Sequence, residues 1–257
     1  MPLSFQLPQR RRSDATGVNG GELLREGVEL QAFQDGTQWA YAGAVTLAAA
    51  LRRSLEVDSR ARVLLSGGRT PGPAYAALAR APLPWERVDA ALVDERWLLP
   101  DDPDSNARLV RESLMADRAA KVRFESITRA GRSIEEAVDI ANMHAAQPPA
   151  VVVLGMGDDG HTASLFPGMR GLAQALASPR PYVAVDATGC PGAGPWSRRV
   201  SLTPAGLAPA RHRVLLIRGA GKRALLDRVL AGDDPMEYPV RIAFTTPGAP
   251  LRVLWAP

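Results

Sequence analysis

The sequence predicts an α/β protein with a mostly parallel central sheet that is flanked by helices on both faces. Short apolar segments with strand-like composition alternate with longer segments of helical character along the 257 residues, without an internal repeat. The 46% share of hydrophobic residues is enough to fill a large core. The run 150–154 is an unbroken apolar segment that ends directly in glycines, carboxylates and an imidazole, as expected of a central strand followed by a ligand-binding turn.

The first half of the chain shows this alternation in order. Residues 1–20 are polar and contain glycine, and we expect a flexible N-terminal segment there, followed by a single domain over 21–257. Apolar runs predict strands at 28–33, 62–65, 88–93 and 122–127. Helices are predicted over the alanine-rich segment 38–55, near 72–80, from a cap at Asp104 or Ser105 onward, and near 133–145.

The second half continues the pattern with more strands. We predict strands at 150–154, 181–186, 198–203, 213–218 and 251–255, and a helix at 221–231. The glycine- and proline-rich stretch 187–198 is expected to be a lengthened loop. Because parallel sheets covered by helices bind ligands at the carboxyl ends of their strands, we expect the functional residues in the loops that follow the strands.

Composition excludes several classes of function. The net charge is +4, but only Lys121 and Lys222 of the 31 basic residues are lysines, and the arginines are scattered, so no nucleic-acid partner is expected. The apolar runs are much shorter than the roughly 20 residues of a membrane span, so no membrane partner is expected either. The arginines at 10–12 precede no apolar signal segment, and Cys190 is the single cysteine. Both features predict a cytoplasmic protein, and they leave its oligomeric state open.

The first unusual loop, SGGRTPG over 66–72, follows a predicted strand and precedes a helix. Gly67 and Gly68 allow backbone N–H groups to turn toward one point, and Thr70 adds a hydroxyl at a position where it can cap the helix. With Arg69 beside it, the loop is a candidate anion-binding site. The alternative is an ordinary glycine-rich turn, and the spacing matches neither the dinucleotide nor the P-loop motif.

The second loop begins with Asp94, Glu95 and Arg96 after the strand 88–93. Two carboxylates and a guanidinium at the ligand edge of the sheet are candidates for substrate binding. The alternative is that one of the two acids simply pairs with Arg96.

The third loop follows the strand 150–154 and contains Asp159 and His161 two residues apart. A carboxylate beside an imidazole fixes its tautomer and raises its basicity, which suits a general base that acts on water. The chain has two other histidines, but only His161 follows a strand within a Gly/Asp loop. A metal site at Asp158, Asp159 and His161 is an alternative. No further cluster of histidine or cysteine completes it, so we expect neither a metal nor another cofactor.

Taken together, SGGRTP, DERWLLPDDPDSN and LGMGDDGHTASLFPG closely resemble the 6-phosphogluconolactonases, and the resemblance runs from about residue 25 to the C-terminus. It implies the Rossmann-like fold of the sugar-phosphate isomerase and deaminase superfamily and a cytoplasmic location. It also implies a carboxylic ester hydrolase that opens 6-phospho-D-glucono-1,5-lactone in the oxidative pentose phosphate pathway. A looser match, RRVSLT and then GAGKR, places Arg199 and Lys222 at the basic positions of the family.

The resemblance also implies roles for individual residues. Asp94, Arg96 and Asn106 of the second block are expected to bind substrate. The phosphate is expected at the loop 67–70, neutralised by Lys222, with Arg96 and Arg199 as further candidates. His161 would activate water and Asp159 would orient it. Ser164 is an alternative nucleophile, but it lacks the GxSxG context.

This chain departs from the family pattern at two of these places. Position 69 is commonly serine in the family, and Arg69 could help to hold phosphate or could obstruct it. Arg223 stands between Lys222 and the alanine that usually follows the lysine directly.

Two other functions compete with the lactonase interpretation. Glucosamine-6-phosphate deaminases share the DGH block but carry an acidic residue five positions after the histidine, where this chain has Phe166. A non-catalytic sugar-phosphate sensor would keep the fold and the phosphate loop. However, sensors are usually joined to a DNA-binding module, for which the sequence has no helix-turn-helix, and the Asp/His pair is intact.

Overall fold

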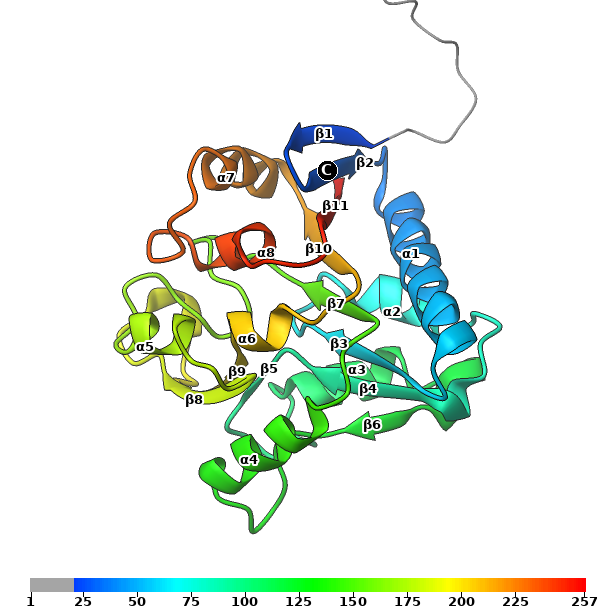
Figure 1. Ribbon diagram of the computed structural model, residues 1–257, viewed down its shortest axis with the longest axis horizontal. Coiled ribbons are helices and arrows are strands. Elements are labelled where there is room, and N and C mark those ends of the chain that lie inside the picture. The colour runs from blue at the N-terminus through cyan, green and yellow to red at the C-terminus, as the bar shows by residue number, and fades with distance from the viewer. Residues whose placement is uncertain (1–20) are drawn as a thin grey trace, which may run out of the picture.

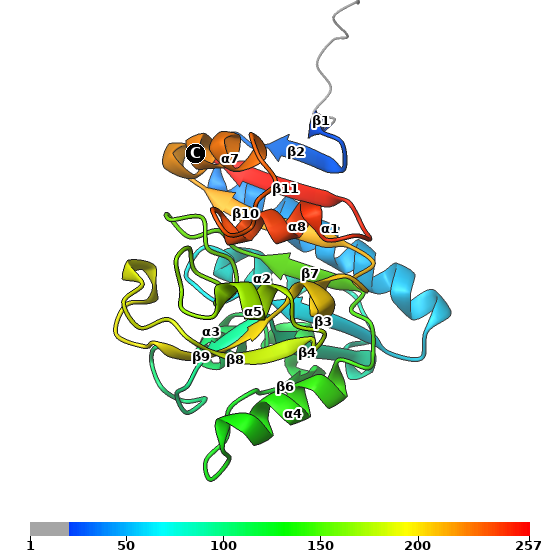
Figure 2. The same ribbon diagram turned by 60° about the vertical axis from the view of Figure 1, so that its left-hand side comes forward.

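The computed structural model describes residues 21–257, so the expected flexible segment 1–20 lies outside the described residues. Eight strands form a central sheet in the spatial order β1 (Glu22–Arg25), β2 (Val28–Ala32), β11 (Leu251–Ala256), β10 (Arg213–Arg218), β7 (Val151–Leu154), β3 (Ala61–Leu65), β4 (Val88–Leu92) and β6 (Arg123–Glu125). Every neighbouring pair is parallel except β1 and β2, which confirms the predicted fold class. Figure 2 shows the strands in this order, from β1 at the top to β6 at the lower edge.

A second, antiparallel sheet of three strands corrects the expectation for Asp94. Its strands are β5 (Asp94–Arg96), β9 (Arg198–Leu202) and β8 (Tyr182–Asp186). Asp94, Glu95 and Arg96 therefore lie in a strand, not in a loop, and Asp94 pairs with Ser201. Val93 makes the transition, because its N–H donates to Leu65 of the large sheet and its carbonyl accepts from Leu202 of the small one.

Helices cover both faces of the large sheet. One face carries α1 (Gly36–Val57), which packs on β3, β7 and β11 and on α2 (Gly72–Leu78); α2 in turn contacts α3 (Asn106–Ser113). The other side carries α7 (Ala220–Leu230) against β10, and α4 (Ile134–His144) against β8 of the small sheet. Figure 1 shows α1 to the right of the sheet and α7, the small sheet and α4 to its left. The remaining short helices are α5 (Leu172–Leu176), α6 (Pro204–Leu207), α8 (Ile242–Thr245) and four 3₁₀ turns at Trp85–Arg87, Asp117–Lys121, Pro191–Ala193 and Pro239–Arg241.

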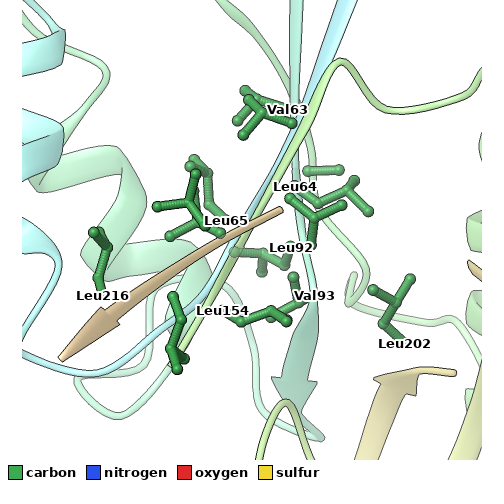
Figure 3. Close-up of a cluster of buried hydrophobic side chains, with 14 of the residues drawn as sticks. Val63, Leu64, Leu65, Leu92, Val93, Leu154, Leu202 and Leu216 are labelled. Atoms are coloured by element: carbon green, nitrogen blue, oxygen red, sulfur yellow. The ribbon is translucent and has the colours of Figure 1, made fainter. Parts of the chain in front are cut away.

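The core lies where the two sheets meet. Strands β3, β4 and β7 are buried along their whole length, as their mainly apolar sequences predict. Arg62 of β3 and Asp89 of β4 are the two charged residues buried with them. Figure 3 shows valines and leucines of these strands gathered with Leu216 of β10 and Leu202 of β9. Burial of each such side chain contributes about 1.5–3 kcal/mol, so this cluster holds the carboxyl ends of the central strands in fixed positions.

Helix caps determine where the helices near these strand ends begin. Ser105, one of the two expected caps, accepts a hydrogen bond from the Ala107 N–H and starts α3. The expectation for Thr70 is wrong, because Pro71 is the residue that precedes the first turn of α2 and no side chain caps this helix. In the described residues, no helix has both the length and the apolar character needed to cross a membrane.

Candidate active site

A hollow of about 190 Å³ opens at the carboxyl ends of β3, β7 and β10. The loops after these strands supply its walls, together with residues of β5, β9 and the start of α3. This is the position at which open parallel sheets generally bind ligands.

The loop after β3 forms one wall of the hollow. Gly67, Gly68 and Thr70 line it, whereas Arg69 is exposed to solvent and does not. The N–H groups of Gly67 and Gly68 donate to no acceptor in residues 21–257, so both are available to an anion.

The second wall contains Asp94, Arg96 and Asn106. The Asn106 side-chain amide donates to the Asp94 carbonyl at 2.9 Å. The Asp94 carboxylate accepts a 2.6 Å hydrogen bond from the Ser164 hydroxyl and lies 4.0 Å from the Arg199 guanidinium. Asp94 thus links the third loop to β9 at this wall of the hollow.

Glu95 anchors this wall from below. Its fully buried carboxylate accepts hydrogen bonds from the Arg96 N–H and from the Ser105 hydroxyl, both at 2.8 Å. It also accepts the N–H groups of Asn106 and Ala107, so it closes the first turn of α3. Burial raises the pKa of Glu95 despite these donors. The structure shows no ion pair between Arg96 and either acid, because the Arg96 guanidinium donates to the Asp104 carbonyl instead.

The third loop presents His161 to the hollow with Asp159 behind it. The Asp159 carboxylate lies 2.6 Å from His161 Nδ1 and also accepts the His161 N–H at 3.0 Å. Burial alone would raise the pKa of Asp159, but the hydrogen bond and charge of His161 outweigh it, so this pKa lies below its ordinary value. Gly157 makes room for the pair, since a Cβ there would stand 2.0 Å from His161 Nδ1.

Phe166 supports the imidazole from the protein interior. Its ring is fully buried, and its centroid lies 4.3 Å from that of His161. The Arg199 guanidinium lies over the same ring at 5.2 Å. Position 166 therefore gives His161 an apolar neighbour.

The stretch 187–198, whose role the sequence left open, covers the side of the Asp159 and His161 pair. A Cβ on Gly192 would stand 2.5 Å from Asp159 Oδ2 and 3.2 Å from His161 Nδ1, so the backbone of the stretch lies directly against the pair. Arg199 holds the stretch in place by donating to the carbonyls of Ala193 and Trp196 at 2.6 and 2.7 Å. Burial lowers the pKa of the Arg199 guanidinium.

Lys222 reaches the hollow from the first turn of α7. Its ammonium donates to the Met156 carbonyl at 2.6 Å and pairs with Asp158 at 2.7 Å. Lys222 follows β10 and the loop 67–70 follows β3, and these two strands are separated by β7. Lys222 and residues of the loop nevertheless line the same hollow. Asp158 is almost fully exposed, so its pairing leaves the ammonium accessible.

Sequence reasoning missed several residues of the hollow. Arg218, the last residue of β10, lines it, and a basic residue at the end of a predicted strand is a signal that could have found it. Ala163 also lines the hollow with a left-handed φ of 49°, and nothing in the sequence indicates this. In residues 21–257 no group of three or more histidine, cysteine, aspartate or glutamate side chains is arranged to hold a metal ion.

The fold and this hollow define an α/β protein with a candidate catalytic Asp/His pair and free backbone N–H groups at the carboxyl ends of its central strands, and comparison with known proteins gives the family. Residues 34–255 match the model of the glucosamine-6-phosphate isomerases/6-phosphogluconolactonase family, and the chain belongs to this family.

Known relatives agree with this assignment. The chain is 47% identical over 230 residues to a 6-phosphogluconolactonase of Xylella fastidiosa, covering 89% of this chain and 96% of the relative. It is 40% identical over 243 residues to a 6-phosphogluconolactonase of Pseudomonas aeruginosa, covering 91% and 97%. The crystal structure of a 6-phosphogluconolactonase from Shewanella baltica superposes with a TM-score of 0.82 at 30% identity, covering 89% and 97%. The resemblance expected from the sequence is therefore confirmed.

Proposed function

We propose that this protein hydrolyses 6-phospho-D-glucono-1,5-lactone to 6-phospho-D-gluconate in the oxidative pentose phosphate pathway. The relatives that it matches over most of its length are named 6-phosphogluconolactonases. The observation that carries the proposal is the His161 and Asp159 pair, which opens into a hollow that also contains cations and free backbone N–H groups. The partner is a small sugar-phosphate lactone, and the reaction takes place in the cytoplasm.

The phosphate binds between the loop after β3 and Lys222. Free N–H groups at Gly67 and Gly68 and the Thr70 hydroxyl offer hydrogen bonds, and the ammonium offers a charge. Arg96 and Arg218 also line the hollow and add positive potential to it. Binding energy from the phosphate, remote from the ester, orients the lactone ring toward His161.

His161 acts as a general base on water. With its Nδ1–H donated to Asp159, the ring keeps Nε2 free to take a proton from a water molecule. The resulting hydroxide adds to the lactone carbonyl carbon and forms a tetrahedral intermediate, whose negative oxygen is stabilised by nearby donors. When the ring C–O bond breaks, the leaving oxygen takes the proton back from the imidazolium. Asp159 stabilises that imidazolium while it exists.

The surroundings of Ser164 favour water over a serine nucleophile. Its side chain is fully buried, it does not line the hollow, and its hydroxyl donates to Asp94. A covalent mechanism would need this hydroxyl to leave Asp94 and reach the substrate.

Phe166 argues against the deaminase alternative. Ring opening of an amino sugar is helped by a carboxylate that shares a proton with the histidine, and the structure puts an apolar ring against His161 at this position. A pure sensor function does not need the Asp159 and His161 pair that the hollow contains.

The test is to generate the lactone in situ and to compare its disappearance with the spontaneous rate. We expect acceleration proportional to the amount of protein, and no ammonia release from glucosamine 6-phosphate. Lactone loss at the spontaneous rate would refute the proposal, and ammonia release would favour the deaminase alternative.

A further inference from the structure

A second hollow, of about 580 Å³, lies beside β6 at the edge of the large sheet. We call it the edge hollow and define it by Arg111, Arg123, Thr128, Arg129, Arg132 and His144, which line it. Several of these residues lie in the segment that connects the carboxyl end of β6 to α4. Figure 1 shows these two elements at the lower end of the molecule. None of these residues lines the hollow that contains His161.

The edge hollow is lined by more basic than acidic side chains. Four arginines line it, and Glu125 is its one acidic residue. The Glu125 carboxylate is already occupied, because it accepts hydrogen bonds from Arg62 at 2.9 and 3.2 Å and lies 3.6 Å from Arg123 and 3.4 Å from His144. The remaining positive charge is therefore not neutralised by this side chain.

Arg129 and Arg132 are the two cations that lack a counter-charge. Neither forms an ion pair with any residue in 21–257, whereas Arg111 pairs with Asp101 and Arg123 pairs with Asp89. Glu136 and Asp139 share a surface depression with these two arginines, but Glu136 caps α4 and Asp139 pairs with Arg180, so neither forms an ion pair with Arg129 or Arg132. Arginine forks are also the side chains best suited to bind phosphate oxygens in pairs.

Thr128 supplies the second, independent observation. Its side chain is 2% exposed, and its hydroxyl is buried without a hydrogen-bond partner. A buried polar group without a partner is costly, and native proteins rarely keep one without a reason. Thr128 lines the edge hollow, and its hydroxyl, which is shielded from solvent in this structure, would reach a ligand oxygen there by a rotation of the side chain.

From the unpaired arginines and the unpartnered hydroxyl together, we propose that the edge hollow is a second binding site for a phosphorylated small molecule. Its volume is in the range of small-molecule sites, and Phe124 and Ile140 give it apolar wall on which the rest of such a ligand can pack. This inference does not depend on the lactone chemistry at His161.

The test uses pyrophosphate as the probe, with binding to the full chain measured by calorimetry at low salt. We compare the wild type with Arg129→Ala/Arg132→Ala and with the matched variant Arg118→Ala/Arg170→Ala, which removes two exposed arginines for which the structure shows no side-chain partner. We expect a class of pyrophosphate sites whose Kd rises about tenfold or more in the first variant and stays within about twofold in the second. Equal affinity in both variants would overturn the proposal.

Thr128→Val distinguishes a ligand-binding hydroxyl from one that is merely buried. If the hydroxyl binds the anion, the variant weakens pyrophosphate binding about threefold or more and melts at a higher temperature than the wild type in anion-free buffer. Unchanged affinity in a folded Thr128→Val protein would remove the hydroxyl from the site and contradict the proposal. Activity at His161 without pyrophosphate serves as the folding control for every variant and should not change.

Discussion

Replacing Lys222 by alanine tests how the phosphate is held. In the structure the Lys222 ammonium donates to the Met156 carbonyl and pairs with the exposed Asp158. A substrate phosphate must displace these partners or share the ammonium with them. Exchange of the Asp158 contact costs little, because exposed ion pairs contribute only about 0–1 kcal/mol. A hydrogen bond from a charged group contributes about 1.5–3 kcal/mol, so Lys222→Ala should lower kcat/KM for the phosphorylated lactone by about 10- to 150-fold.

The comparison substrate is unphosphorylated gluconolactone, on which the same variant should lose less than about threefold, because it presents no charge to the ammonium. Lys121→Ala is the control variant, since Lys121 is the only other lysine and is exposed in a 3₁₀ turn far from the hollow in sequence. Initial rates of Lys222→Ala and Lys121→Ala on both lactones, each compared with the wild type, give the four changes in kcat/KM. An equal loss on both substrates, or no loss on either, would refute the reasoning and leave Lys222 as a structural residue.

Further predictions concern the stretch 187–198 that lies against Asp159 and His161, the stability of the protein at acid pH, and the need for a metal. Gly192→Ala should lower kcat by about tenfold or more without changing the melting temperature much, because the new Cβ would stand 2.5 Å from Asp159 Oδ2 and displace it; Gly72→Ala, where a Cβ meets open space, is the control. Burial would raise the pKa of Asp89, but its arginine partners outweigh this and lower it. Its contribution to the free energy of unfolding is therefore complete above about pH 4 and is lost as the pH falls through the lower folded pKa. Asp89→Asn should reduce the dependence of the free energy of unfolding on pH in the acid range, measured by urea titrations at several pH values. An unchanged pH dependence would contradict the assignment. Exhaustive EDTA treatment should leave lactone hydrolysis unchanged, and a loss restored only by added metal would disprove a metal-independent reaction.

The fold could be predicted well from the sequence because its main signals are local. Short, mainly apolar runs marked β3, β4, β7 and β10, and the helices between them implied parallel neighbours. The small sheet could not be predicted in this way. Its register joins Asp94 to Ser201 and Arg96 to Arg199, and pairing between such distant residues leaves no periodic signal in either segment.

The candidate site follows the same division. Strand ends placed the loop 67–70, His161 and Lys222 at one edge of the sheet, and the structure gathers them in one hollow. The sequence did not indicate that Gly192 lies against Asp159, because this contact depends on how Arg199 holds a distant stretch. Nor did it indicate that Arg69 faces solvent, since the direction of one side chain in a turn depends on backbone angles that composition does not determine.

The most direct test of the account is the rate of lactone hydrolysis by His161→Asn. If His161 is the general base, this variant should bind the product 6-phosphogluconate with an affinity within about threefold of the wild type. It should also lose about 10²- to 10⁴-fold in kcat, because general-base assistance contributes that much. A folded His161→Asn protein that still turns over the lactone at nearly the wild-type rate would contradict the account, because asparagine cannot accept a proton from water as the imidazole does.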